Sequence, residues 1–126
     1  MLKSIQVFLG ERNIVSGFQL EVEKEEGIKI STFGNVSGTP QEKYIVPKDR
    51  KLVGISGAAG WYIDSLAFVF DNGSTTPKYG GEGGDLNFTL VLNKKQTGEY
   101  LGRLMGFWGS HTSVLETIGL VFWPIE

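Results

Sequence analysis

The sequence contains no cysteine and a single histidine, His111, among its 126 residues. Without cysteine there is no disulfide framework, no thiolate metal site and no cysteine nucleophile, and one histidine excludes a multi-histidine metal centre. Neither sign of charge dominates, because 12 basic residues stand against 14 acidic ones for a net charge of −2. A charge this small attracts neither nucleic acid nor an anionic membrane. We therefore expect no metal, no cofactor and no nucleic-acid partner.

Long apolar runs and helical periodicity are also missing. No stretch approaches the roughly 20 apolar residues that span a bilayer, and the first eight residues lack the apolar core of a signal peptide. We therefore expect no membrane insertion, and the sequence leaves the compartment open. No window of about a dozen residues keeps apolar positions at helical spacing without a glycine or proline, so a substantial helix is not expected.

Glycine, in contrast, is abundant, with 18 residues or about twice the average usage. The glycines separate short runs in which large apolar residues alternate with smaller or polar ones, at residues 18–22, 28–30, 66–70 and 88–92. Alternation with period two is typical of a strand that buries one face. We therefore predict an all-β protein that forms one compact domain over residues 1–126.

The second half of the chain contains an internal repeat. Residues 52–70 align without gaps with residues 104–122, an offset of 52, and five positions are identical. A third, more divergent unit would lie in residues 1–33, with a hairpin that turns at residues 24–27. Short antiparallel units cannot bury an apolar face alone, so we expect three of them around a shared core.

Three segments resemble the jacalin-related lectins: Ile55–Leu66, Tyr79–Gly84 and Gly106–Leu120. The resemblance extends from about residue 17 to residue 123. It implies a β-prism I fold of three four-stranded Greek-key sheets with pseudo-threefold symmetry. It also implies a non-enzymatic, metal-independent carbohydrate-binding domain. The likeness is to the uncut, single-chain branch of the family, so the implied ligands are glycans that contain mannose or glucose.

In that family a Gly-x-x-x-Asp turn and a glycine-rich loop together form a sugar site. Both elements are intact here, at residues 60–64 and 80–84. A hexose presents adjacent hydroxyls, for which a carboxylate supplies acceptors and exposed backbone amides supply donors. The resemblance assigns the carboxylate to Asp64 and the donor amides to Trp61, Tyr62 and Gly84. The expected carbohydrate-binding residues are Gly60, Trp61, Tyr62, Ile63, Asp64, Gly83 and Gly84.

The corresponding turns of the other units depart from the pattern. Residues 112–116 carry Thr112 for glycine and Glu116 for aspartate, and their expected partner at residues 9–13 has no double glycine. Residues 24–28 of the first unit contain no aspartate. We therefore expect one site per chain and millimolar affinity for a monosaccharide, so that several copies or an attached domain are needed for avidity. We also expect Gly84→Val to cost more in affinity than in stability.

Structural roles for the same residues stay open. Residues 80–84 could be only a strand connection, and Asp64 could simply cap its own turn. In that case the alternative is a β-prism scaffold for protein–protein interaction or oligomerisation that has lost sugar binding. The sequence offers no nucleophile with a matching base, so we expect no catalytic residue, and His111 is interpreted as a solvated loop residue.

Overall fold

A computed structural model describes residues 1–100 and 102–124, and nearly all of its regular structure is β-strand. The elements are β1 (Leu2–Leu9), the short 3-10 turn η1 (Glu11–Asn13), β2 (Val15–Lys24), β3 (Gly27–Gly34), β4 (Thr39–Pro40), β5 (Tyr44–Ile45), β6 (Leu52–Ala59), β7 (Ile63–Phe70), β8 (Tyr79–Gly80), β9 (Leu86–Val91), β10 (Gly102–His111) and β11 (Leu115–Pro124). In the described part of the chain no helix is long and apolar enough to cross a membrane. The all-β prediction is confirmed.

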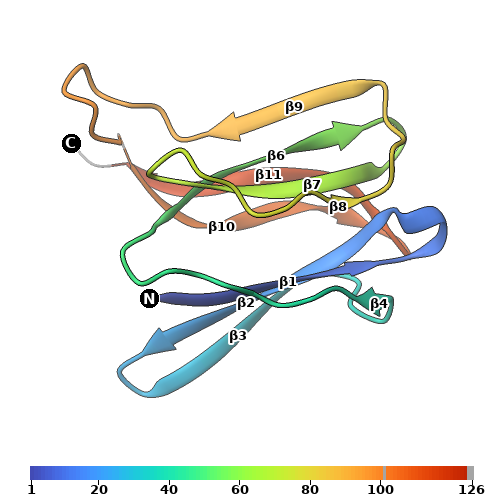
Figure 1. The fold of residues 1–126 in the computed structure, drawn as a ribbon, viewed down its shortest axis with the longest axis horizontal. Helices are drawn as coiled ribbons and strands as arrows, with labels where there is room; N and C mark the ends of the chain where they lie inside the picture. Colours follow the sequence, from blue (N-terminus) through green and yellow to red (C-terminus); the bar gives the residue numbers. More distant parts are fainter. Residues whose placement is uncertain (101, 125–126) are drawn as a thin grey trace.

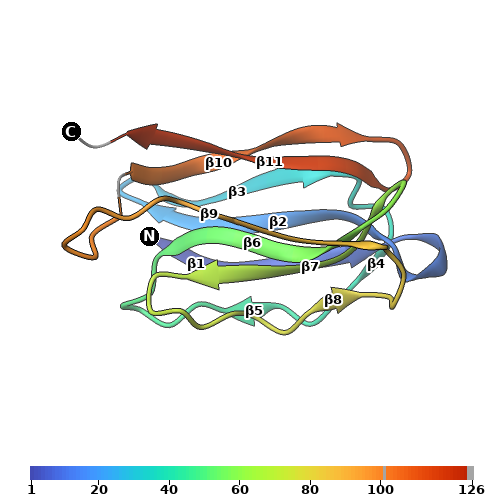
Figure 2. The ribbon, with the colours of Figure 1, turned by 90° about the horizontal axis from the view of Figure 1, so that it is seen from above.

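The strands form three antiparallel sheets around one core (Figures 1 and 2). The first has the order β3-β2-β1-β4, with β5 also paired to β1, and the second has the order β8-β7-β6-β9. Within the described residues the third sheet consists of β10 and β11 alone. This arrangement agrees with the predicted β-prism, but only the second sheet has the expected four strands. The first gains a strand because β4 and β5 share one edge of β1.

Strand register reproduces the internal repeat residue by residue. Ala59 pairs with Ile63 after a register shift, and His111 pairs with Leu115 after a shift at the equivalent place. The hairpin predicted at residues 24–27 is present between β2 and β3. It is not, however, the counterpart of the other two hairpins. That counterpart is the β1–β2 pair, which turns at residues 10–14. Because this turn is longer than the other two, the first unit does not align with the others at a fixed offset of 52 residues.

The core is centred on Phe18 of β2, which is completely buried. Its ring centroid lies 5.1 Å from that of Phe68 in the second sheet and 5.1 Å from that of Phe107 in the third. Both contacts are edge-to-face, the geometry that aromatic pairs prefer, and Phe33 of the same sheet stacks on Phe18 at 5.1 Å. Phe18 therefore joins all three sheets.

Removing the Phe18 ring should lower the free energy of unfolding more than truncating an exposed side chain of a strand. We expect Phe18→Ala to lower the free energy of unfolding by about 3–5 kcal/mol, the range for a large buried aromatic. Ile30→Ala, at a side chain that is 57% exposed, is the control and should change it by no more than about 0.5 kcal/mol. Urea denaturation measures both, and equal losses would show that Phe18 is not the centre of the core.

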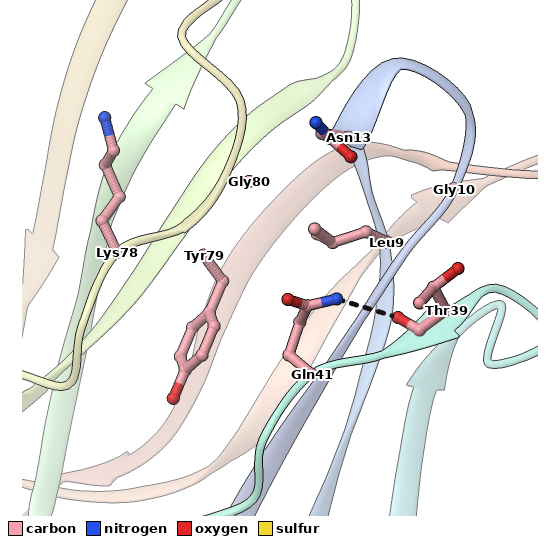
Figure 3. Close-up of a pocket in the computed structure, with 8 residues that line it drawn as sticks. All are labelled: Leu9, Gly10, Asn13, Thr39, Gln41, Lys78, Tyr79 and Gly80. Carbon is pink, nitrogen blue, oxygen red and sulfur yellow. Dashed lines mark hydrogen bonds between the residues drawn. The ribbon is translucent and has the colours of Figure 1, made fainter.

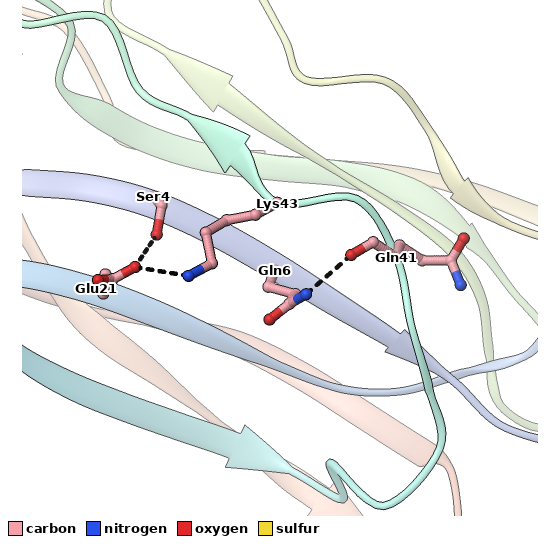
Figure 4. A network of polar contacts seen from close by, with 5 residues as sticks. All are labelled: Ser4, Gln6, Glu21, Gln41 and Lys43. Carbon is pink, nitrogen blue, oxygen red and sulfur yellow. Dashed lines mark hydrogen bonds and ion pairs between the residues drawn. The ribbon is translucent and has the colours of Figure 1, made fainter.

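A polar network covers the outer face of the first sheet (Figure 4). The nearly buried Ser4 hydroxyl donates to Glu21 Oε1 at 2.7 Å, and Lys43 Nζ contacts the same oxygen at 3.0 Å. These two hydrogen bonds, Ser4 first and then Lys43, hold the pKa of Glu21 below its ordinary value. The network thus ties the segment before β5 to β1 and β2.

Acid should weaken this network in a defined direction. Because the pKa of Glu21 is lower in the folded state, its contribution to stability is present above the ordinary glutamate pKa and is lost as pH falls through the folded-state pKa. We expect Glu21→Gln to lose less stability than the parent between neutral pH and about pH 3. Glu25→Gln, at an exposed hairpin position, should behave like the parent. Urea titrations across pH measure this, and parallel curves for all three proteins would contradict it.

Candidate functional site

The turn between β6 and β7 projects two aromatic side chains into solvent. The Gly60 N–H donates to the Tyr62 carbonyl at 3.0 Å, which closes the turn over three residues. The side chain of Trp61 is 93% exposed and that of Tyr62 is 38% exposed, as expected for rim residues. Ile63 differs from the expectation, because its side chain is buried in the core cluster. Its role in the turn is therefore packing beneath the site.

The glycine-rich loop between β8 and β9 lies directly against this turn. Its first part is held by Gly81, whose N–H donates to the main-chain carbonyl of Asp64 at 3.0 Å. A Cβ atom on Gly83 would lie 2.7 Å from Asp64 Oδ1, and one on Gly84 would lie 3.0 Å from Asp64 Oδ2. The Asp64 carboxylate is therefore enclosed between turn and loop, and the structure brings Gly60, Asp64, Gly83 and Gly84 together as the sequence predicted.

Several polar groups at this place have no internal partner. Within residues 1–100 and 102–124 the Asp64 carboxylate makes no side-chain hydrogen bond or ion pair, so it does not cap its own turn. In the same described part, the N–H groups of Trp61, Tyr62 and Gly84 donate to no backbone acceptor. Two carboxylate oxygens and three amide donors thus remain for a ligand, a combination that suits adjacent hydroxyl groups.

The third unit keeps the turn but changes its surroundings. Thr112 N–H donates to the Val114 carbonyl at 2.9 Å, the same bond that Gly60 makes, so the turn survives the threonine. Its neighbours are the Asn35 side chain, whose amide donates to the Ser113 carbonyl at 3.3 Å, and Gly10, on which a Cβ would lie 3.0 Å from Val114 Cγ1. Neither contact involves Glu116, whereas Gly83 and Gly84 lie against the Asp64 carboxylate. His111 is exposed, in agreement with the solvated role expected for it.

The first unit has lost its acceptor altogether. Asn35 N–H donates to the Ser16 carbonyl at 2.9 Å, which repeats the bond from Gly81 to Asp64 and makes Ser16 the counterpart of Asp64. The Ser16 side chain is fully buried and donates to the Phe8 carbonyl at 3.0 Å. The motif position of this unit is therefore Ser16, not residues 24–28 as the sequence suggested. The conclusion that it carries no carboxylate is unchanged.

A cavity adjoins the start of the glycine-rich loop, and nothing in the sequence indicated it (Figure 3). This cavity, of ≈ 360 Å³, is lined by Leu9, Gly10, Asn13, Thr39, Gln41, Lys78, Tyr79 and Gly80. Burial, followed by the nearby Tyr44 and Glu42, raises the pKa of Tyr79, so its phenol keeps its proton at neutral pH. The lining comes from three separate stretches of chain, which no local motif could connect.

Metal-binding chemistry finds no support in the part of the chain that the structure describes. Across residues 1–100 and 102–124, no three histidine, aspartate or glutamate side chains lie close enough together to hold an ion.

Residues 1–121 match the family model described as Jacalin-like lectin domain, so the chain belongs to this family. Among curated proteins it is 28% identical over 119 residues to a Schizosaccharomyces pombe protein whose name gives it as a candidate zinc metalloproteinase. That match covers 94% of this chain but only 15% of the length of the yeast protein.

Three solved structures share the fold at low sequence identity. Calystegia sepium agglutinin aligns with a TM-score of 0.73 at 21% identity, over 98% of this chain and 83% of its own. Wild-type Malaysian banana lectin gives 0.71 at 18% identity, over 98% and 84%. Artocarpin in complex with methyl-α-mannose gives 0.70 at 20% identity, over 96% and 82%. These likenesses establish the β-prism fold.

The two loop glycines should respond differently to a side chain. Gly84 has φ +94°, and its Cβ would lie 2.9 Å from the Ala59 backbone nitrogen, so Gly84→Val is not the affinity-selective variant that the sequence suggested. We expect even Gly84→Ala to cost about 1 kcal/mol or more of stability. The three atoms nearest to a Cβ on Gly83 all belong to the Asp64 side chain, so Gly83→Ala should change stability by less than about 0.5 kcal/mol while displacing the carboxylate.

Urea denaturation, with the side-chain carbon resonance of Asp64 followed by NMR, separates the two effects. An unchanged Asp64 resonance in Gly83→Ala would contradict the contact between Gly83 and the carboxylate. A Gly84→Ala variant as stable as the parent would contradict the predicted strain at Gly84.

Proposed function

We propose that this domain binds a glycan containing mannose or glucose through one metal-independent site. In this proposal Asp64 accepts hydrogen bonds from two adjacent sugar hydroxyls. The amides of Trp61, Tyr62 and Gly84 donate to further sugar oxygens, and the exposed rings of Trp61 and Tyr62 form the rim. Gly60 and Gly83 keep the approach to the carboxylate open.

The proposal is carried by the Asp64 carboxylate, which lies between two glycine-bearing segments and makes no hydrogen bond or ion pair within residues 1–100 and 102–124. The Asp64 side chain is half-buried, and it needs glycine beside it, because a Cβ on Gly83 would lie 2.7 Å from its Oδ1. Membership of the Jacalin-like lectin domain family and the mannoside in the artocarpin complex support the choice of sugar.

The expected affinity for a single sugar is low. Each hydrogen bond contributes about 1 kcal/mol net, so a handful of them gives roughly −4 kcal/mol, or millimolar binding of a monosaccharide. Useful retention on a cell surface or a resin would then come from several copies or an attached domain, which raises the apparent affinity by about 10² or more.

Two matched variants test the site. Asp64→Asn should abolish retention on immobilised mannose or glucose, because the amide replaces one acceptor oxygen with a donor. Glu116→Gln makes the same chemical change in the third unit and should leave retention unaltered. Calorimetry should give one sugar per chain for the parent, and unchanged melting curves should confirm that both variants fold.

Loss of binding in Glu116→Gln, or two or three sugars per chain, would show that the third turn also binds. Should the parent retain no glycan on an array of mannose- and glucose-containing sugars, the β-prism is an interaction scaffold instead. The first unit has already lost its carboxylate in this way, because the buried Ser16 occupies its motif position.

A further inference from the structure

We propose that the free edge of β10 docks an extended peptide segment of a partner protein, which adds to the third sheet as an antiparallel strand. The segment would be uncharged at its centre, with large apolar residues alternating with polar ones. This inference goes beyond the proposed function and does not depend on it, because β10 and Asp64 belong to different sheets.

The third sheet lacks a strand that the second sheet has. In the second sheet, β6 pairs with β7 on one side and with β9 on the other. β10 is the counterpart of β6 at the offset of 52, but across residues 1–100 and 102–124 it pairs with β11 alone. Within that part of the chain, the other edge of β10 has no strand partner, and its backbone groups are a template for one.

Gly106 on this edge is a glycine whose surroundings leave room for a side chain. Its counterpart in the second unit, Gly54, has no such room, because a Cβ there would collide with the Leu90 carbonyl oxygen and lie 2.8 Å from Val91 Cα, both in β9. A Cβ on Gly106 would meet only two ring atoms of Phe33 among the described residues, at 3.9 and 4.0 Å, and its φ is not positive. Glycine in a strand costs stability. A strand in the place equivalent to β9 would require glycine here too.

A cavity beside β10 offers space for a side chain of the added strand. It has a volume of ≈ 300 Å³, and its lining includes the aromatic rings of Phe33 and Phe107 together with Gly109. In the second unit, Phe88 of β9 pairs with Gly57, the counterpart of Gly109, and packs against the core. A strand that pairs with β10 in the register of β9 would place its own residue opposite Gly109, beside this cavity. We therefore expect a large apolar side chain at that position of the partner.

The charge of the edge indicates the composition of its partner. Charged residues or proline normally protect edge strands from pairing, and residues 106–110 contain neither. Residues 86–91, in the equivalent place of the second unit, are also uncharged. A second copy of this chain suits the edge less well, because its strands already belong to sheets and β3 runs close beside β10 (Figure 2). A single extended segment needs less space than a second sheet.

Amide hydrogen exchange, followed by NMR on the whole chain, tests the site with a synthetic peptide of residues 85–92, which contains the β9 sequence, with lysines added at both ends for solubility. We expect the β10 amides that face away from β11 to exchange about tenfold more slowly or less when the peptide is in excess. The same peptide with Thr89→Pro lacks a central backbone donor and should protect nothing. No protection by the first peptide, or protection confined to β3 or β6, would overturn the proposal.

A single methyl group then locates the added strand. Gly106→Ala should keep or raise the melting temperature of the free chain, because its Cβ would make only ordinary contact with Phe33. It should weaken peptide binding by about tenfold or more, since a Cβ on the equivalent Gly54 would collide with β9. Val121→Ala is the matched control, because Val121 pairs with Gly106 from the β11 side, and it should bind the peptide like the parent.

Equal peptide binding by Gly106→Ala and the parent would overturn the proposal. A free chain that sediments as a dimer, with the outward β10 amides already protected, would overturn it as well, because a second copy would then occupy the edge.

Discussion

The structure depends on a core that no single sheet can build. Each sheet has one apolar face, and Phe18 contacts a ring from each of the other two sheets at a centroid distance of 5.1 Å. Because the three faces cover one another, the hairpins must run side by side, and their turns emerge at the same end of the molecule (Figures 1 and 2). The polar groups proposed to bind a glycan are therefore positioned by aromatic packing in which they take no part.

Much of the fold could be predicted from the sequence, because alternation and glycine turns act over a few residues. The strands β7 and β9 follow the alternating runs at residues 66–70 and 88–92. The composition of the sheets could not be predicted in the same way. β4 and β5 contain two residues each, too few for any alternation, and they pair with β1 only through contacts across the first sheet. The longer turn between β1 and β2 likewise changed the spacing of the first unit. The β1–β2 hairpin could therefore not be recognised from the sequence as the counterpart of the other two hairpins.

In the candidate site, too, some features could be predicted from local sequence motifs and others arise only on folding. Asp64 and the glycine-rich loop belong to motifs in which spacing alone carries information, and the structure joins them. Ile63 was assigned to the site by its place within the motif, yet a residue next to a turn in a period-two strand must face one side or the other, and this one faces the core. The cavity was invisible because Asn13, Gln41 and Lys78 meet only after folding. No pattern in any one segment indicates it.

The hydrogen bond from Gly81 to the main chain of Asp64 has a consequence for the thermodynamics of any ligand that binds there. It fixes the loop against the turn in the free domain, so the conformational entropy of ordering these segments is lost during folding rather than on association. A shallow site with few contacts gains most from such preorganisation, since little of its modest binding enthalpy is offset by immobilisation. Rigidity of the backbone, as much as the number of contacting atoms, thus governs how weakly or tightly this end of the prism can hold a ligand.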